Sequence, residues 1–336
     1  MYGHCMSPDS EAEMIVVDLD RCNEPPTPLH FYGPPVVAVA SSRPTADSQA
    51  SEWADRAMFT LTEVPTDDIR LVHVESVEAA LDDVRSTIAD NPIAATVCDD
   101  VLRANSVGTG TREGLTIESL GYSTLQAGPE FARWLADQQP RVRHEQDDAV
   151  ILDRTGDILT ITFNRPDRHN AFSNILRAGL LDGLHTAVAD PTITDVVFTG
   201  AGRSFCSGGD LREFGMFADP ANAHLARTRY SPALLLNAVR ERLGVRLRAE
   251  VHGAVLGSGL EMAAYCGRVV SRPDAVFGLP ELGLGLIPGA GGTVSVPRRI
   301  GRWRTAYLAA SGRNVDAATA LSWGLVDELA PPVDER

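Results

Sequence analysis

Three features of the sequence predict an α/β fold. Short apolar runs, such as DVVFTG at 195–200, alternate with amphipathic segments of helical length, which is the pattern of strands and helices packed in layers. Two of these runs are followed by glycine-rich stretches, at 200–209 and 257–259. The composition, 44% apolar and 22% charged over 336 residues, is ordinary for a globular protein of one large domain with an appendage, or of two modest domains.

The N-terminal half is predicted to begin with strands and to continue with helices. Residues 14–19 and 35–40 have the character of short buried strands, within a segment 1–74 whose role the sequence does not indicate. Residues 75–137 are predicted to be helical. In the first of these helices, Ser76 lies at the capping position. One apolar stripe is formed by Val77, Leu81, Val84 and Ile88. Asn91-Pro92 is predicted to end the first of these helices and to begin the next.

The C-terminal half is predicted to be a second domain with alternating strands and helices. The polar stretch 138–148 is predicted to be a linker to this domain, at 149–336. In that domain, 149–166 has the pattern of two strands around a tight turn. The other predicted elements are a helix at 172–189, strands at 195–200 and 247–257, and a strand pair at 268–280.

Charge and cysteine content argue against several classes of function. A net charge of -15 argues against a broad basic face for nucleic acid, so no nucleic-acid partner is expected. The five cysteines are scattered and form no CxxC, which argues against a disulfide framework or a metal site and fits a reducing cytoplasm. No apolar run reaches the length of a membrane span, and the N-terminus has no signal-peptide pattern. A cytoplasmic protein without a membrane partner is expected.

The segment GAGRSFCSGGDLREF, at 200–214, has the pattern of a strand, a glycine turn and then a helix. Gly208 and Gly209 have no Cβ, so a ligand can approach their backbone, and N–H groups near a helix N-terminus can bind an anion or oxyanion. The alternative is an ordinary strand-to-helix turn capped by Asp210.

Two glutamates lie in otherwise apolar segments. Glu261 is in the first turn of an apolar helix that follows the GSG turn, and a glutamate in a dry site can acquire a raised pKa and act as an acid or base. A plain role at the helix N-terminus is the alternative. Glu281 follows a proline in FGLPELGLGLIPGAGG, where an exposed turn is the alternative. Together with two peptide N–H donors, these carboxylates are suited to stabilise a thioester enolate while a proton or a water moves.

The stretch 158–327 resembles the crotonase (enoyl-CoA hydratase/isomerase) superfamily. The resemblance rests on ITFNRPDRHNAFS, VVFTGAGRSFCSGGDL, HGAVLGSGLEMAAYCG, FGLPELGLGLIPGAGG and SGRNVDAATALSWGLVDEL, which occur in the family's order and cover about half of the chain. It implies a spiral of repeated ββα units with a helical subdomain. It also implies a homotrimer or a dimer of trimers, and an acyl-CoA thioester as substrate, with no metal and no separate cofactor.

The resemblance also implies roles for individual residues. It places the thioester carbonyl between the amides of Gly209 and Ser258, and it makes Glu261 and Glu281 the two catalytic glutamates of a hydratase. It assigns contacts with coenzyme A to two further segments, through Arg165, Arg168, Asn170, Ala171, Ser207 and Gly208.

The sequence departs from the family in several places. The family's C-terminal helices are expected after the GLVDEL motif, and 75–137 resembles them, so we expect these helices to lie N-terminal to the core here; an unrelated helical extension is the alternative. Asp99 falls where the family often has a phosphate-binding lysine, which leaves Arg165, Arg168 or Arg103 for that role. His252 is interpreted as a structural histidine at the end of a strand. Cys206 is interpreted as a packing residue, because no neighbouring base argues for a thiolate.

Hydration of a trans-2-enoyl-CoA is the leading functional hypothesis, and three alternatives remain. One is an isomerase that shifts the double bond, or a specialised acyl-CoA lyase. A second is a cofactor-independent oxygenase branch with long N-terminal helices, although that branch replaces the two glutamates. The third is a non-catalytic acyl-CoA binder, which retention of both carboxylates disfavours. The acyl-chain length and the physiological direction are not encoded in any single motif.

Overall fold

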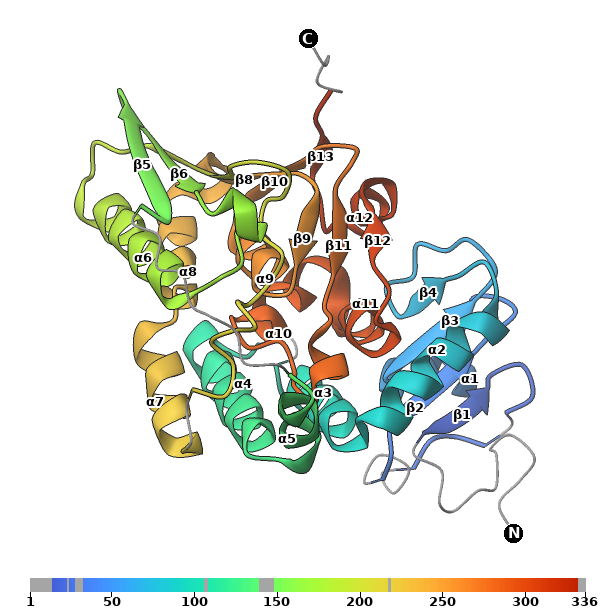
Figure 1. Cartoon of the computed structure of the whole chain (residues 1–336). Coiled ribbons are helices and arrows are strands. Elements are labelled where there is room, and N and C mark those ends of the chain that lie inside the picture. The colour runs from blue at the N-terminus through green and yellow to red at the C-terminus, as the bar shows by residue number, and fades with distance from the viewer. Residues whose placement is uncertain are drawn as a thin grey trace.

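The computed structural model describes residues 14–22, 24–27, 33–105, 108–138, 148–216 and 219–331 (Figure 1). Its strands form three sheets, and helices cover them, as expected for an α/β protein. The predicted linker falls almost entirely outside the described residues, so the domain boundaries stay a prediction. Within the described part, no helix is long and apolar enough to pass through a bilayer.

The N-terminal segment forms a four-stranded parallel sheet beside helix α1. Its elements are β1 (Ile15–Asp18), β2 (Val36–Val39), α1 (Gln49–Arg56), β3 (Phe59–Thr62) and β4 (Leu71–His73), with the strands in the order β1-β2-β3-β4. Side chains alternate between the two faces of a strand. Val36 and Ala38 therefore pack with Trp53 of α1, whereas Val37 belongs to the main core. Strands β3 and β4 contact helix α11 (Pro297–Ser311), which joins this sheet to the rest of the molecule.

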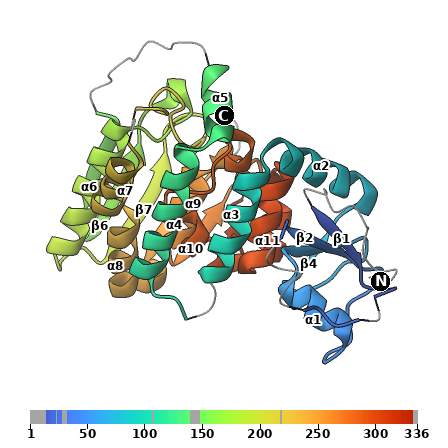
Figure 2. The same ribbon diagram turned by 90° about the horizontal axis from the view of Figure 1, so that it is seen from below.

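The helical region predicted at 75–137 is confirmed. It comprises α2 (Val77–Asp90), α3 (Pro92–Ala104), α4 (Thr111–Gln126) and α5 (Pro129–Ala136). The side chain of Ser76 accepts a hydrogen bond from the amide of Ala79, as its capping position predicted. Helix α4 packs against α3, α7 (Pro220–Tyr230) and the short α10 (Gly292–Ser295), so this region lies directly over the C-terminal half (Figure 2).

A six-stranded sheet forms the centre of the C-terminal half. Its strands are β5 (Val150–Thr155), β6 (Ile158–Phe163), β7 (Asp195–Gly200), β8 (Leu247–Val251), β10 (Arg268–Ser271) and β13 (Glu328–Leu329). The order is β13-β10-β8-β7-β6-β5, and every pair is parallel except the β5–β6 hairpin. The hairpin predicted at 149–166 is therefore confirmed.

A smaller sheet explains one incorrect prediction. The stretch 247–257 was expected to be a single strand, but the chain turns at Gly253, where φ is +54°, and divides it into β8 and β9 (Ala254–Leu256). Strand β9 pairs with β11 (Val276–Gly278), which pairs with β12 (Val315–Asp316). The expected ββα unit consists of β8 in the large sheet, β9 in the small sheet and helix α9 (Ser258–Tyr265).

The remaining helices of the described residues are α6 (Asn174–Ala189), α8 (Ala233–Leu243) and α12 (Ala317–Trp323). Short 3-10 turns are η2 (Pro166–Arg168), η3 (Gly244–Arg246) and η4 (Glu281–Leu284). Helices α7 and α8 lie in a stretch for which no element was predicted. The helix expected directly after Gly209 is absent from described residues 210–216, which form turns instead.

Candidate active site

The two glycine-rich turns lie side by side. After β7 the chain passes beside β9, where Cys206 forms an isolated bridge with Val255, and then beside the loop that precedes α6, where Gly209 forms another with Phe172. Gly208 lies between them with φ +100°, a conformation that favours glycine. The local backbone thus brings Gly209 next to the start of α9, as the sequence predicted for an oxyanion site.

Two peptide N–H groups are available at this junction. Gly209 and Ser258 both line one pocket, and among the described residues neither amide has an internal acceptor. Ser258 is the first residue of α9, so its N–H is one of those that a helix leaves without an intrahelical partner. The buried side-chain oxygen of Ser258 is also without a partner in the described structure. These donors are arranged to bind a ligand oxygen.

Glu261 is held by the loop that follows η4. It is 2% exposed, and its Oε2 accepts hydrogen bonds from the amides of Ala290 and Gly292, each at 2.7 Å. Glu261 is therefore a buried side chain fixed by long-range contacts, which goes beyond a plain helix-terminal role. Its carboxyl group lines the same pocket as Gly209 and Ser258.

Glu281 enters the pocket from the opposite segment, at the start of η4. Its Oε2 is buried and has no hydrogen-bond partner within the described residues, which excludes the exposed-turn alternative. Gly257, with φ +47°, permits this approach, because a methyl group there would overlap Oε1 of Glu281. The four predicted catalytic positions are therefore brought together in one site.

The environment raises the pKa of both glutamates. Burial is the main cause for Glu261, and the charges of Glu281 and Glu118 add to it. Burial likewise raises the pKa of Glu281 to about 8, with a further contribution from Glu118. Carboxylates that interact this closely share protons as a group. The site can consequently hold a proton donor and a proton acceptor near neutral pH.

Glu118 is a site residue that the sequence did not reveal. It comes from α4 and is buried; its Oε1 accepts a hydrogen bond from the amide of Gly291 at 2.7 Å, and its Oε2 from the amide and the hydroxyl of Thr293 at 2.9 and 2.7 Å. Four successive amides of this loop thus alternate between two carboxylates, Glu261 for the first and third and Glu118 for the second and fourth. Burial raises the pKa of Glu118 to about 7.

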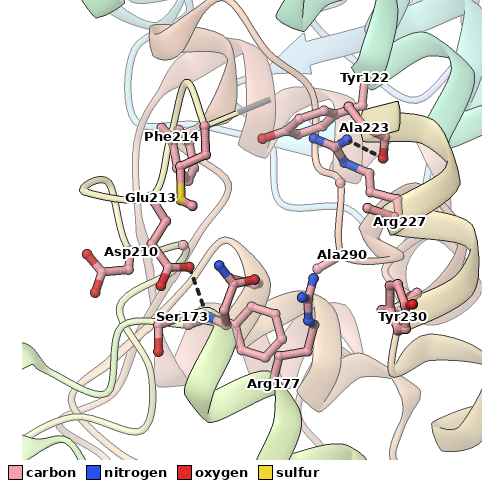
Figure 3. A pocket seen from close by; sticks show the side chains of 18 of the residues that line it. Tyr122, Ser173, Arg177, Asp210, Glu213, Phe214, Ala223, Arg227, Tyr230 and Ala290 are labelled. Atoms are coloured by element: carbon pink, nitrogen blue, oxygen red, sulfur yellow. Dashed lines mark hydrogen bonds between the residues drawn. The ribbon is translucent and has the colours of Figure 1, made fainter. Parts of the chain in front are cut away.

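The remaining walls of the pocket combine aromatic, polar and cationic side chains (Figure 3). Helix α4 contributes Tyr122, helix α6 contributes Arg177, and helix α7 contributes Arg227 and Tyr230. The guanidinium of Arg227 lies 3.7 Å from the centre of the Tyr122 ring. None of these four residues belongs to a recognisable motif, and two of them lie on the unpredicted helix α7.

The residues expected to contact coenzyme A do not line this pocket, and two of them have structural roles. Arg165 is buried and donates to the backbone oxygen of Ala171 at 2.6 Å and to Asp210 at 3.0 Å. The Asn170 side chain accepts from the Arg165 amide and donates to two backbone oxygens of the neighbouring loop. Arg168 is exposed, and Ala171 is partly exposed beside it. Ser207 is partly exposed too, and Gly208 is buried.

Asp210 does not cap a helix. It accepts hydrogen bonds from Arg165 and Arg212, and although burial alone would raise its pKa, the bonds from these arginines lower the pKa overall. This buried cluster ties the loop after β7 to the loop before α6. Asp99 is likewise buried and paired with Arg103 at 2.8 Å, so neither Asp99 nor its partner faces the pocket.

Two further interpretations agree with the structure. Burial raises the pKa of the Cys206 thiol to about 12, which fits a packing role because a thiolate would be disfavoured. The Nε2 of His252 lies 3.0 Å from the backbone oxygen of Gly202, an interaction that holds the end of β8.

Comparison with known proteins identifies the family. The model of the enoyl-CoA hydratase/isomerase family matches residues 153–335, more than half of the chain. The chain belongs to this family. The match begins in β5 and includes both glutamates and both glycine-rich turns, so the predicted crotonase resemblance is confirmed.

Members of the enoyl-CoA hydratase/isomerase family with assigned names include two hydratases. The chain is 37% identical over 189 residues to 2,3-dehydroadipyl-CoA hydratase of Escherichia coli, covering 54% of the chain and 69% of that relative. It is 34% identical to mevalonyl-coenzyme A hydratase SIDH of Beauveria bassiana, covering 52% and 64%. The chain thus spans about two thirds of each relative. These relatives support a hydratase function.

The chain is also similar to a solved structure. The enoyl-CoA hydratase of Thermoplasma volcanium is 34% identical, with 54% of this chain and 71% of that chain covered and a TM-score of 0.47. Helices α2–α5 lie outside the family match. Their correspondence to the family's C-terminal helices stays a prediction.

Proposed function

We propose that this protein is a hydro-lyase that adds water across the double bond of a trans-2-enoyl-CoA thioester. One observation carries the proposal: a single pocket is lined by two peptide N–H groups that have no acceptor among the described residues, by the buried Glu261 and by the half-buried Glu281. The names of the relatives support the same reaction. Addition of water changes no oxidation state overall, so the proposed reaction requires no redox cofactor.

The reaction begins with polarisation of the substrate. The amides of Gly209 and Ser258 bind the thioester oxygen and stabilise the negative charge that develops on it in the enolate. One donor of this kind can lower the barrier by roughly 3–4 kcal/mol. Because both amides are fixed by their turns, they need no rearrangement when the charge develops.

The two glutamates divide the proton transfers. The carboxylate of Glu261 takes a proton from water, whose hydroxyl adds to the β-carbon, and Glu281 gives its proton to the α-carbon. This assignment is supported by hydrogen bonding: two amides bind Oε2 of Glu261 and favour its anion, whereas Oε2 of Glu281 has no donor in the described structure. A proton must then return from Glu261 to Glu281 through water before the next cycle.

Assembly and location are part of the same proposal. We infer a homotrimer or a dimer of trimers from the family resemblance, and a cytoplasmic location from the scattered cysteines, which form no CxxC. The coenzyme A portion would extend from the pocket toward the loop that carries Arg168, the exposed cation of the segment predicted to bind it.

The direct test is a spectroscopic assay. Purified protein is incubated with crotonyl-CoA and with a longer enoyl-CoA, and the absorbance of the conjugated thioester is followed beside Glu261→Gln. Loss of absorbance with the wild type and none with the variant supports hydration. A shifted double bond in the product would establish the isomerase alternative, and binding of the thioester without turnover would establish the non-catalytic alternative.

A further inference from the structure

Two arginines reach into the pocket from different helices. Figure 3 shows Arg177 projecting from α6 and Arg227 from α7 toward the same opening, with Tyr230 beside the first and Tyr122 beside the second. Both arginines are partly buried. A wall that bound only a hydrocarbon chain would not need two cations, and burying them has a cost in free energy.

Among the described residues, the side chain of Arg177 has no hydrogen-bonded or ion-paired partner. Its guanidinium carbon lies 5.8 Å from the centre of the Tyr230 ring. Burial lowers the pKa of Arg177, and the nearby charges of Glu213 and Tyr230 only partly offset that effect. A partly desolvated guanidinium of this kind has five donors suited to a carboxylate.

Arg227 is held in place by neutral groups. It donates to Gln126 at 2.9 Å and to the backbone oxygen of Ala223 at 3.3 Å, and it stacks on Tyr122. Burial lowers its pKa as well. No carboxylate in the described part lies within ion-pair distance of Arg227, although the charge of Glu118 attracts it from farther away. Arg227 thus supplies positive charge at a fixed position.

The acidic side chains around the pocket are committed to other groups. Asp210 binds Arg165 and Arg212, Glu118 binds the loop after η4, and Glu213 accepts a hydrogen bond from the amide of Asn174 at 2.8 Å. In the described structure none of these carboxylates pairs directly with Arg177 or Arg227, so both guanidinium groups keep donors for a ligand that enters between α6 and α7.

We propose that the preferred substrate is an enoyl-CoA whose acyl chain ends in a carboxylate, which binds Arg177 directly while Arg227 supplies further positive charge. The inference rests on the proposed function, because it uses the same pocket. The phosphates of coenzyme A are a second source of negative charge, and they would contact the arginines whatever acyl group is attached. A comparison of acyl groups on one carrier separates the two sources.

The test uses two six-carbon trans-2-enoyl-CoA thioesters, one ending in a methyl group and one in a carboxylate. They are assayed with the wild type, Arg177→Met, Arg177→Lys and Arg229→Met, the last being an exposed arginine on the same helix as Arg227 and outside the pocket wall. We expect the wild type to prefer the carboxylate substrate. Arg177→Met should raise KM for that substrate about 10- to 100-fold and leave the methyl substrate nearly unchanged. Arg177→Lys should restore part of the loss, and Arg229→Met should match the wild type.

Two results would overturn the inference. If Arg177→Met raised KM equally for both substrates, Arg177 would bind the coenzyme A phosphates. If the wild type preferred the methyl substrate, the proposed recognition of a carboxylate would be wrong. Calorimetric binding of both thioesters keeps this test separate from the reaction. If neither is hydrated but the carboxylate thioester binds more tightly in an Arg177-dependent way, the ligand class stands and the hydratase proposal falls.

Discussion

Replacement of Glu118 with glutamine is expected to slow hydration although Glu118 need not touch the substrate. Its two oxygens accept three hydrogen bonds from the loop that also holds Glu261. Glutamine offers one carbonyl oxygen and one NH2 group, so at least one loop amide would face a donor. A buried donor left without an acceptor costs about 1–3 kcal/mol.

The loss is expected to appear mainly in kcat. The amides of Ala290 and Gly292 alternate with those that bind Glu118, so a shift of the loop displaces Glu261 directly. Since a misplacement of about 1 Å can cost about 100-fold in rate, we expect kcat to fall about 10- to 100-fold with KM nearly unchanged. Removing the charge of Glu118 should also lower the pKa values of Glu261 and Glu281, which burial and this charge raise, and so move the pH profile to lower pH.

Glu130→Gln provides a matched control. Glu130 is also buried, and it binds the amides of Ile93 and Ala94 at the start of α3, but it does not line the pocket. Glu130→Gln should lower the free energy of unfolding about as much as Glu118→Gln does, but it should leave the pH profile of kcat/KM unchanged. If the two variants gave the same kcat and the same profile, the role of Glu118 in positioning Glu261 would be refuted.

Three further predictions follow from the site and its supporting loops. Burial raises the pKa of Glu281 to about 8, and a raised pKa keeps the proton donor protonated below that pH, so kcat/KM for hydration should fall as pH rises through about 8; a rate that keeps rising above pH 9 would contradict this. Gly257→Ala should lower kcat sharply and reduce the free energy of unfolding by about 1–3 kcal/mol, because Gly257 has positive φ and its new methyl would overlap Glu281. Gly283→Ala, which has open space around the new methyl, should match the wild type in both kcat and unfolding. Arg165→Met should reduce the free energy of unfolding by about 3 kcal/mol because it breaks a buried ion pair with Asp210. Arg168→Met should leave the free energy of unfolding unchanged and weaken binding of free coenzyme A. The reverse pattern in unfolding and calorimetry would contradict both assignments.

The pocket positions that we propose to be catalytic could be predicted from the sequence because their signals are local. A strand, a glycine turn and an apolar helix start are neighbours in the chain, and Glu261 lies within that pattern. The same locality explains the confirmed cap at Ser76 and the β5–β6 hairpin. Buried polar residues in such patterns indicate a site because an apolar residue would otherwise be favoured there.

The features that were missed depend on contacts between distant segments. Glu118 and its partner Gly291 are 173 residues apart, and on the sequence Glu118 is one more charged residue of an amphipathic helix. The structural role of Arg165 depends on Asp210, 45 residues away. The division of 247–257 into β8 and β9 also follows from pairing with two different sheets, which no local apolar pattern encodes.

The most direct test of the two-glutamate hydration is product analysis in labelled water. Crotonyl-CoA is converted in deuterium oxide enriched in oxygen-18, and the product is examined by mass spectrometry and NMR with the wild type, Glu261→Gln and Glu281→Gln. We predict 3-hydroxybutyryl-CoA with one deuterium at the α-carbon and oxygen-18 at the β-carbon, and loss of that product in both variants. A wild-type product without oxygen-18, or full labelling in either variant, would contradict the account.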